Sequence, residues 1–250
     1  MPTWHRYEEL RPDQLELLLK EAPIAHWPLG LLEHHGWHLP IGFDGLKADR
    51  ICRRLADRTG GVLLPVMWWG GLGGHDVFKW SHYQDPKAFG GMLVETSGQL
   101  LAYGFRVLVL MAGHYPWQDV LDAEIPALRQ AFPDALILAG TEISICGDAV
   151  TVRGDHAARE ETSFGLALFP EQIDLDALTP GRDDTVWPGA TPPPADRRHP
   201  RVEFDASAPL FAQMGEDARE ASAARGEEGV AQVVDHLART IDGFLGRDAS

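Results

Sequence analysis

Residues Leu29–Asp44, with the sequence LGLLEHHGWHLPIGFD, carry five side chains that can bind a transition metal. These side chains are Glu33, His34, His35, His38 and Asp44. Imidazoles and carboxylates together form sites for zinc, manganese and iron. Three glycines in the segment allow tight turns that crowd side chains into one cleft. A polar surface turn, with Asp44 capping the next helix, is the alternative interpretation. We favour the metal site.

Two later segments carry further side chains of the same kinds. The first is Ala112-Gly113-His114, and the second is Asp155-His156-Ala157-Ala158-Arg159-Glu160-Glu161-Thr162-Ser163. Glycine beside histidine is a weak signal alone. The acidic residues and the histidine of the second segment make the metal interpretation of the whole set stronger.

The elements that must position these residues alternate between short apolar runs and longer amphipathic ones. We predict strands at 24–32, 62–68, 106–111 and 135–139, and helices at 44–59, 86–103, 118–131, 160–168 and near 230–245. The run RVLVLM at 106–111 is almost continuously apolar, which is typical of a parallel strand covered on both faces.

This alternation predicts an α/β fold with a mostly parallel central sheet and helices on both faces. In such sheets ligands bind at the carboxyl ends of the strands. Glu33 and His35 follow the first predicted strand, His114 follows the third, and His156 lies beyond the fourth. We therefore expect residues far apart in sequence to meet at one edge of the sheet.

Composition narrows the class of protein. The 250 residues carry a net charge of −15, which argues against nucleic acid and against an anionic membrane surface. A small-molecule substrate is expected instead. No apolar run has membrane-spanning length, and the polar N-terminus does not resemble a signal peptide. Two cysteines, Cys52 and Cys146, favour reduced thiols and a cytoplasmic protein, although a disulfide stays possible.

The three segments together resemble the creatininase family. Glu33-His34-His35-Gly36-Trp37-His38-Leu39-Pro40 with Asp44 is similar to that family's Glu-Gln-His-Gly-Pro-His-Leu-Pro…Asp signature. Ala112-Gly113-His114 resembles its Asn-Gly-His strand end. The segment from Asp155 resembles its His-Ala-Gly…Glu-Thr-Ser motif. The resemblance covers roughly residues 20–170.

The resemblance implies one creatininase-like domain, a three-layer sandwich over residues 1–250, that hydrolyses a carbon–nitrogen bond in a cyclic or formyl amide. It implies two divalent ions, usually zinc, manganese or iron, and a homohexamer. The implied metal ligands are Glu33, His35, Asp44, His114 and Glu161, with Asp44 bridging, and the implied catalytic residues are His156 and Glu161. Two metals about 3.5–4 Å apart can activate a water at neutral pH, and a histidine can protonate the leaving nitrogen.

The chain departs from the family pattern at several positions. In creatininase proper a metal-binding Glu lies two residues after the strand-end histidine, where this chain has Pro116. Either Glu161 replaces that ligand or the second metal is weak or absent, and we favour Glu161. Ala112, His34, Trp37 and Ala158 replace Asn, Gln, Pro and Gly. Creatinine itself becomes a less favoured substrate.

Other residues have weaker claims. We predict substrate contacts from His75, which follows a glycine-rich turn, and from Tyr115 and Trp117. Asp155 is considered as a residue that orients His156, and His34 is expected to face solvent. His38 is assigned either to ligation or to a supporting role. His199 is expected to be structural or exposed. The proline-rich arm near 180–200 is expected to be stiff and extended, either as a surface connection or as an arm that borders the site or a neighbouring subunit.

Two other functions stay open. A relative of this family could open the ring of an oxidised cyclic polyol or trim a modified peptide. A keto-cyclitol hydrolase would need polar groups where an amide hydrolase has aromatic ones. The third possibility is a non-catalytic metal-binding or scaffold subunit that has lost the second metal at Pro116.

Overall fold

A parallel five-stranded sheet forms the centre of the protein. The computed structural model describes residues 3–247, and its sheet has the order β1-β3-β2-β4-β5 with every neighbouring pair parallel. The strands are β1 Trp4–Arg6, β2 Ile24–Leu29, β3 Gly61–Leu63, β4 Val107–Ala112 and β5 Leu136–Thr141. The predicted α/β class with a mostly parallel sheet is confirmed.

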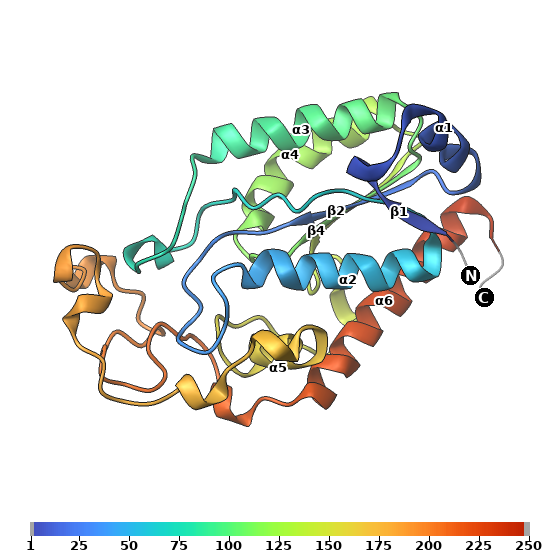
Figure 1. Cartoon of the computed structure of the whole chain (residues 1–250). Coiled ribbons are helices and arrows are strands. Elements are labelled where there is room, and N and C mark those ends of the chain that lie inside the picture. The colour runs from blue at the N-terminus through green and yellow to red at the C-terminus, as the bar shows by residue number, and fades with distance from the viewer. Residues whose placement is uncertain (1–2, 248–250) are drawn as a thin grey trace.

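Helices cover both faces of this sheet. They are α1 Pro12–Glu21, α2 Phe43–Thr59, α3 Pro86–Ala102, α4 Trp117–Ala131, α5 Arg159–Leu168 and α6 Ala223–Leu245. Figure 1 shows α1, α3 and α4 on one side and α2, α5 and α6 on the other. Alternate residues of a strand point to opposite faces, so Val107, Val109 and Met111 of β4 join the core under α2 and α6. Leu108 and Leu110 join the core under α3 and α4.

Two predicted strands are shorter in the structure, and one pair of elements was not predicted. The strand expected at 24–32 ends at Leu29, because Gly30 crosses α2 so closely that a Cβ on it would lie 2.5 Å from Gly45 Cα. The strand expected at 62–68 ends at Leu63, and Pro65, which has no amide hydrogen, follows soon after. The elements that were not predicted are the short edge strand β1 and the helix α1, which buries only Leu18. Their sequences show no clear hydrophobic pattern.

The proline-rich arm is not extended, which corrects the prediction. It forms single 3₁₀ turns, at Asp184–Val186, Pro188–Ala190 and Ala195–Arg197. These turns pack around a separate apolar cluster that contains Phe78, Trp187, Val202 and Phe211. Figure 1 shows the arm, in orange, beside the teal turn His75–Val77, which lies between β3 and α3 in the chain. The arm therefore borders the edge of the sheet where the candidate site residues were expected.

Among the helices that residues 3–247 form, none combines the length and apolar composition needed to cross a bilayer.

The contact between Gly113 and Asp44 supplies a first prediction. A Cβ on Gly113 would lie 1.9 Å from the backbone oxygen of Asp44, so Gly113→Ala must push the end of β4 away from the start of α2. We expect a loss of about 3 kcal/mol in the free energy of unfolding, measured by urea denaturation. The matched control is Gly91→Ala on α3, where no atom lies within 4 Å of the added Cβ. This control should gain about 0.5–1 kcal/mol, and equal effects of the two changes would contradict the prediction.

Candidate metal centre

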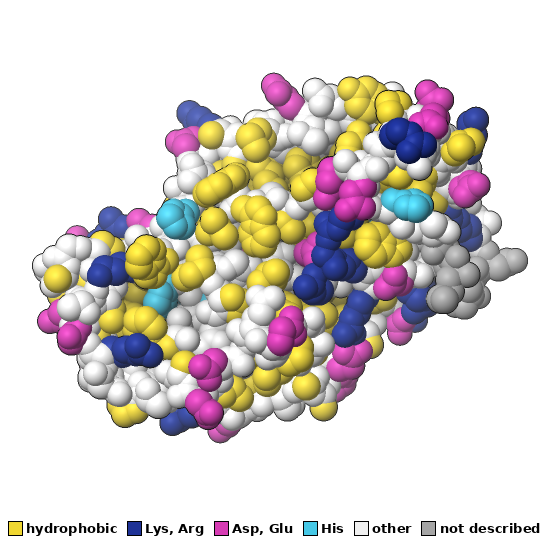
Figure 2. All heavy atoms as spheres, in the orientation of Figure 1, with side chains coloured by type: hydrophobic (Ala, Val, Ile, Leu, Met, Phe, Trp, Pro, Cys, Tyr) yellow, Lys and Arg dark blue, Asp and Glu magenta, His cyan; other side chains and the backbone are white. Residues whose placement is uncertain are grey.

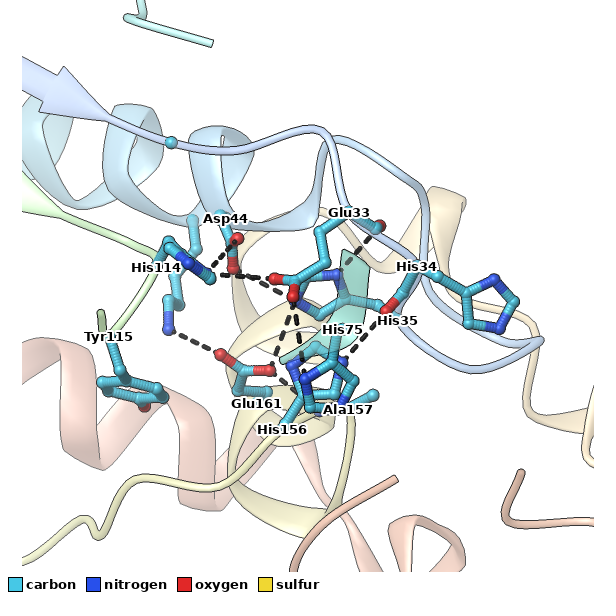
Figure 3. A network of polar contacts seen from close by, with 12 residues as sticks. Glu33, His34, His35, Asp44, His75, His114, Tyr115, His156, Ala157 and Glu161 are labelled. Atoms are coloured by element: carbon cyan, nitrogen blue, oxygen red, sulfur yellow. Dashed lines mark hydrogen bonds and ion pairs between the residues drawn. The ribbon is translucent and has the colours of Figure 1, made fainter. Parts of the chain in front are cut away.

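Side chains from four separate segments converge at the carboxyl ends of β2, β4 and β5. Glu33 and His35 follow β2, and His114 follows β4. Asp44 lies in the first turn of α2, and Glu161 lies in the first turn of α5. Figure 3 shows these five side chains pointing toward one another, and all are buried. The structure thus brings together every residue for which the sequence predicted metal ligation.

Two groups of three ligands share Asp44. In the first group, His114 Nδ1 lies 3.0 Å from Glu33 Oε2 and 3.3 Å from Asp44 Oδ2. In the second, His35 Nε2 lies 3.1 Å from Asp44 Oδ1 and 3.6 Å from Glu161 Oε2. The two oxygens of Asp44 therefore face different histidines. A bridging carboxylate between two metals needs this arrangement.

Each ring that would bind a metal is oriented by its other nitrogen. His35 Nδ1 lies 3.1 Å from the backbone oxygen of Glu33, and His114 Nε2 lies 3.0 Å from the backbone oxygen of Leu72. A hydrogen bond of this kind fixes the tautomer, so that the opposite nitrogen is free to act as a ligand. Tyr83 acts similarly on the carboxylate: its hydroxyl donates to Glu33 Oε1 and leaves Oε2 facing the cluster.

The chemistry of these donors fits divalent metals. Glu33 Oε2, His35 Nε2 and Asp44 Oδ2 are buried and make no hydrogen bond with any residue in 3–247. Burial lowers the pKa of His35, but the charges of Asp44, Glu161 and Glu33 outweigh it and raise that pKa to about 9. The pKa of His114 is also raised, because Glu33 and Asp44 outweigh its burial. Protons on the two rings thus supply positive charge at the point where metal ions would supply it.

A buried lysine supports Glu161 from the side away from His35. Lys47, one turn after Asp44 on α2, has its Nζ 3.0 Å from Glu161 Oε1 and 3.1 Å from Glu142 Oε1. Tyr115 donates to the same Glu142 oxygen at 2.7 Å, and its ring lies 4.6 Å from the lysine Nζ. Lys47, Glu142 and Tyr83 were not singled out in the sequence. The position of Glu142 directly after β5 was the one available signal.

His156 lies against the second ligand group. Its ring centroid is 4.4 Å from that of His35 and 3.8 Å from that of His75. Its Nε2 is 3.0 Å from the backbone oxygen of His34, so this nitrogen carries the proton of the neutral ring and Nδ1 is left as an acceptor. Burial first, and then the positive charge of His35, hold the pKa of His156 well below its usual range. The ring is therefore neutral at pH 7.

Two residues near the cluster, Asp155 and His34, differ from the expectations. Asp155 does not orient His156: its carboxylate accepts from the backbone nitrogens of Glu160 and Glu161, at 2.7 and 3.1 Å, and so caps α5. His34 does not face solvent. It is 3% exposed, points away from the cluster in Figure 3, and stacks on Phe78.

His38 has a supporting position. Its Nε2 lies 2.8 Å from Thr162 Oγ1, which links the first motif to α5.

A cavity of about 260 Å³ opens over the cluster. Glu33, Asp44, His114, His156 and Glu161 form part of its lining, and His75, Tyr115 and Pro116 also line it. Trp117 does not. Its ring is fully buried, donates to the backbone oxygen of Gly30 at 3.0 Å and packs on Phe89, so the structure does not place it for the predicted substrate contact.

His199 and Arg201, at the end of the arm, also line the cavity and were not predicted as site residues.

Comparisons with known proteins show which sequences this chain is similar to. A family profile described as "Creatininase: Creatinine amidohydrolase" matches residues 8–241. Creatinine amidohydrolase of Pseudomonas putida is 28% identical over 78% of this chain and 78% of its own length. A mycofactocin precursor peptide peptidase of Mycobacterium ulcerans is 31% identical over 62% of each chain. A 3-dehydro-scyllo-inosose hydrolase of Thermotoga maritima is 26% identical over 68% of this chain and 58% of its own length.

Solved structures share the fold. A creatinine amidohydrolase structure superimposes with a TM-score of 0.72 at 24% identity, covering 97% of both chains. A creatininase solved with manganese gives a TM-score of 0.70 at 24% identity, over 97% of this chain and 98% of that one.

The raised pKa of His35 makes metal binding depend on pH. A histidine must lose its proton to bind a metal, and His35 holds its proton up to about pH 9. Binding of Zn²⁺ or Mn²⁺ at pH 7 should therefore release at least one proton, and the apparent affinity should rise about tenfold per pH unit for each proton released. Calorimetry in two buffers of different ionisation enthalpy measures this release. An affinity that stays constant between pH 6 and 8 would contradict the prediction.

Lys47 should be essential for the stability of the metal-free protein. Lys47→Met leaves Glu142 and Glu161 as buried carboxylates without their cation, and we expect a loss of about 3–5 kcal/mol in the free energy of unfolding. Adding Glu142→Gln to this variant should recover part of the loss. Lys87→Met, an exposed position on α3, is the control and should change stability by less than about 0.5 kcal/mol. Denaturant titrations that show no difference between the two lysines would refute the role of Lys47.

Proposed function

Since the chain belongs to the creatininase family, we propose that it hydrolyses a carbon–nitrogen bond in a small cyclic or formyl amide at a centre of two divalent metals. One observation carries this proposal: the two oxygens of Asp44 face two separate groups of ligands, Glu33 with His114 and His35 with Glu161. A single metal would not need a carboxylate shared in this way. Pro116 offers no carboxylate from α4, and Glu161 is the residue that completes the second group.

The metals, when bound, supply an activated water and polarise the carbonyl of the substrate. Glu33, Asp44 and His114 would hold one ion, and His35, Asp44 and Glu161 would hold the other. Zinc, manganese and iron all suit mixed histidine and carboxylate ligands, and creatininases have been solved in a zinc form and a manganese form.

His156 is the proposed proton carrier. Its ring is neutral, and its Nε2 is engaged with the backbone oxygen of His34, which leaves Nδ1 to accept a proton from the attacking water. The same nitrogen then returns the proton to the leaving nitrogen, as general catalysis requires. Glu161 helps to position this step through its ligand oxygen, and its other oxygen is held by Lys47. His75 and Tyr115, which line the cavity, are the proposed substrate contacts.

A second candidate function follows from the ionisable residues that line the cavity. Tyr115 is the one aromatic ring in the lining apart from the histidines, and carboxylates, imidazoles and a guanidinium supply most of the rest. This lining suits a hydrolase that opens the ring of an oxidised cyclic polyol, the activity named for the Thermotoga maritima relative. A modified-peptide peptidase, as in the mycobacterial relatives, is less well supported because the cavity is small. A scaffold role is disfavoured, because a scaffold has no need of buried, unpaired ligand atoms.

The remaining expectations stay proposals. We propose one domain over residues 1–250, a cytoplasmic location, which the two unpaired buried cysteines support, and a homo-oligomer, with a hexamer as the family resemblance implies. Figure 2 shows hydrophobic side chains gathered on the face between α2 and α3. Trp69 and Met92, 49% and 52% exposed, border a shallow apolar groove with Phe89. A second copy of the chain is the proposed cover for such a surface.

Metal content and turnover test the proposed function together. Elemental analysis of the metal-loaded protein should give two divalent ions per chain, falling toward one in Glu161→Ala. His156→Ala should keep both ions and lower kcat for amide hydrolysis about 10²- to 10⁴-fold. The substrate panel pairs cyclic and formyl amides with keto-inositols, so that turnover of keto-inositols alone selects the second candidate.

A protein that holds no divalent metal and hydrolyses neither class would refute both functions. Two ions retained in Glu161→Ala would remove Glu161 from the ligand set.

A further inference from the structure

We propose that the cavity takes substrates with an anionic group, a carboxylate or a phosphate, and that Arg201 of the proline-rich arm binds this group at the rim. The inference rests on the proposed function and deepens it, because it names a property of the substrate that the metal ligands do not determine. Arg201 and His199 line the same cavity as Glu33, Asp44 and His156. Neither Arg201 nor His199 belongs to the three metal-site motifs.

The arm holds this part of the chain firmly at the cavity. Arg197 pairs with Asp76 at 2.7 Å, which joins the arm to the turn that carries His75. Arg198 Nε donates to the backbone oxygen of Pro193 at 2.9 Å. Val202, next to Arg201, is buried in the apolar cluster of the arm. Residues on both sides of Arg201 are therefore fixed, while its own side chain remains exposed.

Arg201 has no acidic partner. Across residues 3–247 its guanidinium makes no ion pair and no hydrogen bond to another side chain. Two arginines of α2 differ from Arg201 because they are paired, Arg53 with Asp49 at 2.8 Å and Arg58 with Asp235 at 2.8 Å. A chain with a net charge of −15 thus leaves this arginine, among the described residues, unpaired beside the cavity that holds the candidate metal ligands.

The position of the guanidinium suits an anionic substrate. Arginine binds carboxylates and phosphates through two parallel N–H···O bonds. His199 adds a second donor, because its Nδ1 accepts from the backbone nitrogen of Arg201 at 3.3 Å and its Nε2 is left to donate. Binding an anionic group at the rim would leave the carbonyl of the substrate free to lie over the metal ligands on the floor. Without a binding group at the rim, the anionic group of the substrate would compete with the carbonyl for the metals.

The test uses three small formamides that carry different groups at the end distant from the formyl group. N-formylglycine carries a carboxylate, N-formylaminoethyl phosphate carries a phosphate, and N-formylglycinamide is neutral. Formate release by the metal-loaded protein gives kcat/KM for each, and calorimetry gives the binding constant. Arg201→Gln should lower kcat/KM for at least one anionic formamide about tenfold, as expected for one charged hydrogen-bonded contact, and change the neutral one less than twofold. The loss should shrink in high salt, because the rim is exposed.

Arg239→Gln is the matched control. Arg239 lies exposed on α6, away from the cavity lining, and its loss changes the net charge equally. This control should not affect any of the three formamides. Arg201→Lys should recover only part of the preference, because lysine keeps the charge and loses the two-pronged geometry. Loss confined to the carboxylate or to the phosphate supports the inference and identifies the group.

Two results would overturn the inference. One is equal loss for the neutral and anionic formamides in Arg201→Gln, which would make Arg201 structural. The other is anion binding that does not change in Arg201→Gln, which would place the anion elsewhere. If no formamide is hydrolysed, the proposed amide hydrolysis fails, and the three binding constants alone still decide whether Arg201 selects anions.

Discussion

Four carboxylates, Glu33, Asp44, Glu142 and Glu161, are buried close together, each 1% exposed or less. An isolated carboxylate is very unfavourable away from water, so each needs a cation or a hydrogen-bond donor in contact. Lys47 supplies a permanent charge for Glu142 and Glu161. His35 and His114 supply charge only while protonated, and the ligand atoms they face are the ones that would receive metals. Metal binding is therefore built into the electrostatic balance of the core.

The sheet makes this concentration of charge possible. Parallel strands bring their carboxyl ends to one edge, where loop residues can turn inward. Gly30 and Gly113 let the ends of β2 and β4 pass against the first turn of α2 with almost no space between them. Asp44 lies in that turn, between the residues that follow the two strands. The Asp44 carboxylate is thus held by backbone packing as well as by its ionic partners.

Most of the sheet and its helices could be predicted from the sequence, and the reasons are local. Buried parallel strands such as β4 are continuous apolar runs, and α2 to α5 end within about one residue of the predicted limits, because caps, glycines and prolines mark them. The predicted strand beyond Leu63 was wrong because the pattern of apolar residues continued past Pro65. The prediction of an extended arm was wrong because the turns of the arm depend on packing against Phe78 and Trp187. No periodic pattern in the sequence indicates that contact.

The residues of the candidate site also fall into those that the sequence could predict and those that it could not. Glu33, His35, His114 and His156 could be placed together because each follows a strand, and the sheet alone decides where strand ends meet. The positions of Tyr83 and Lys47 could not be predicted, since both depend on tertiary contacts between distant segments. His199 and Arg201 lie in the irregular arm, far from any strand end. The proposed metal ligands are thus placed by the regular fold, while the rim of the cavity is supplied by the irregular arm. A change in the arm would therefore alter which substrate charge the cavity binds and leave the proposed metal ligands in place.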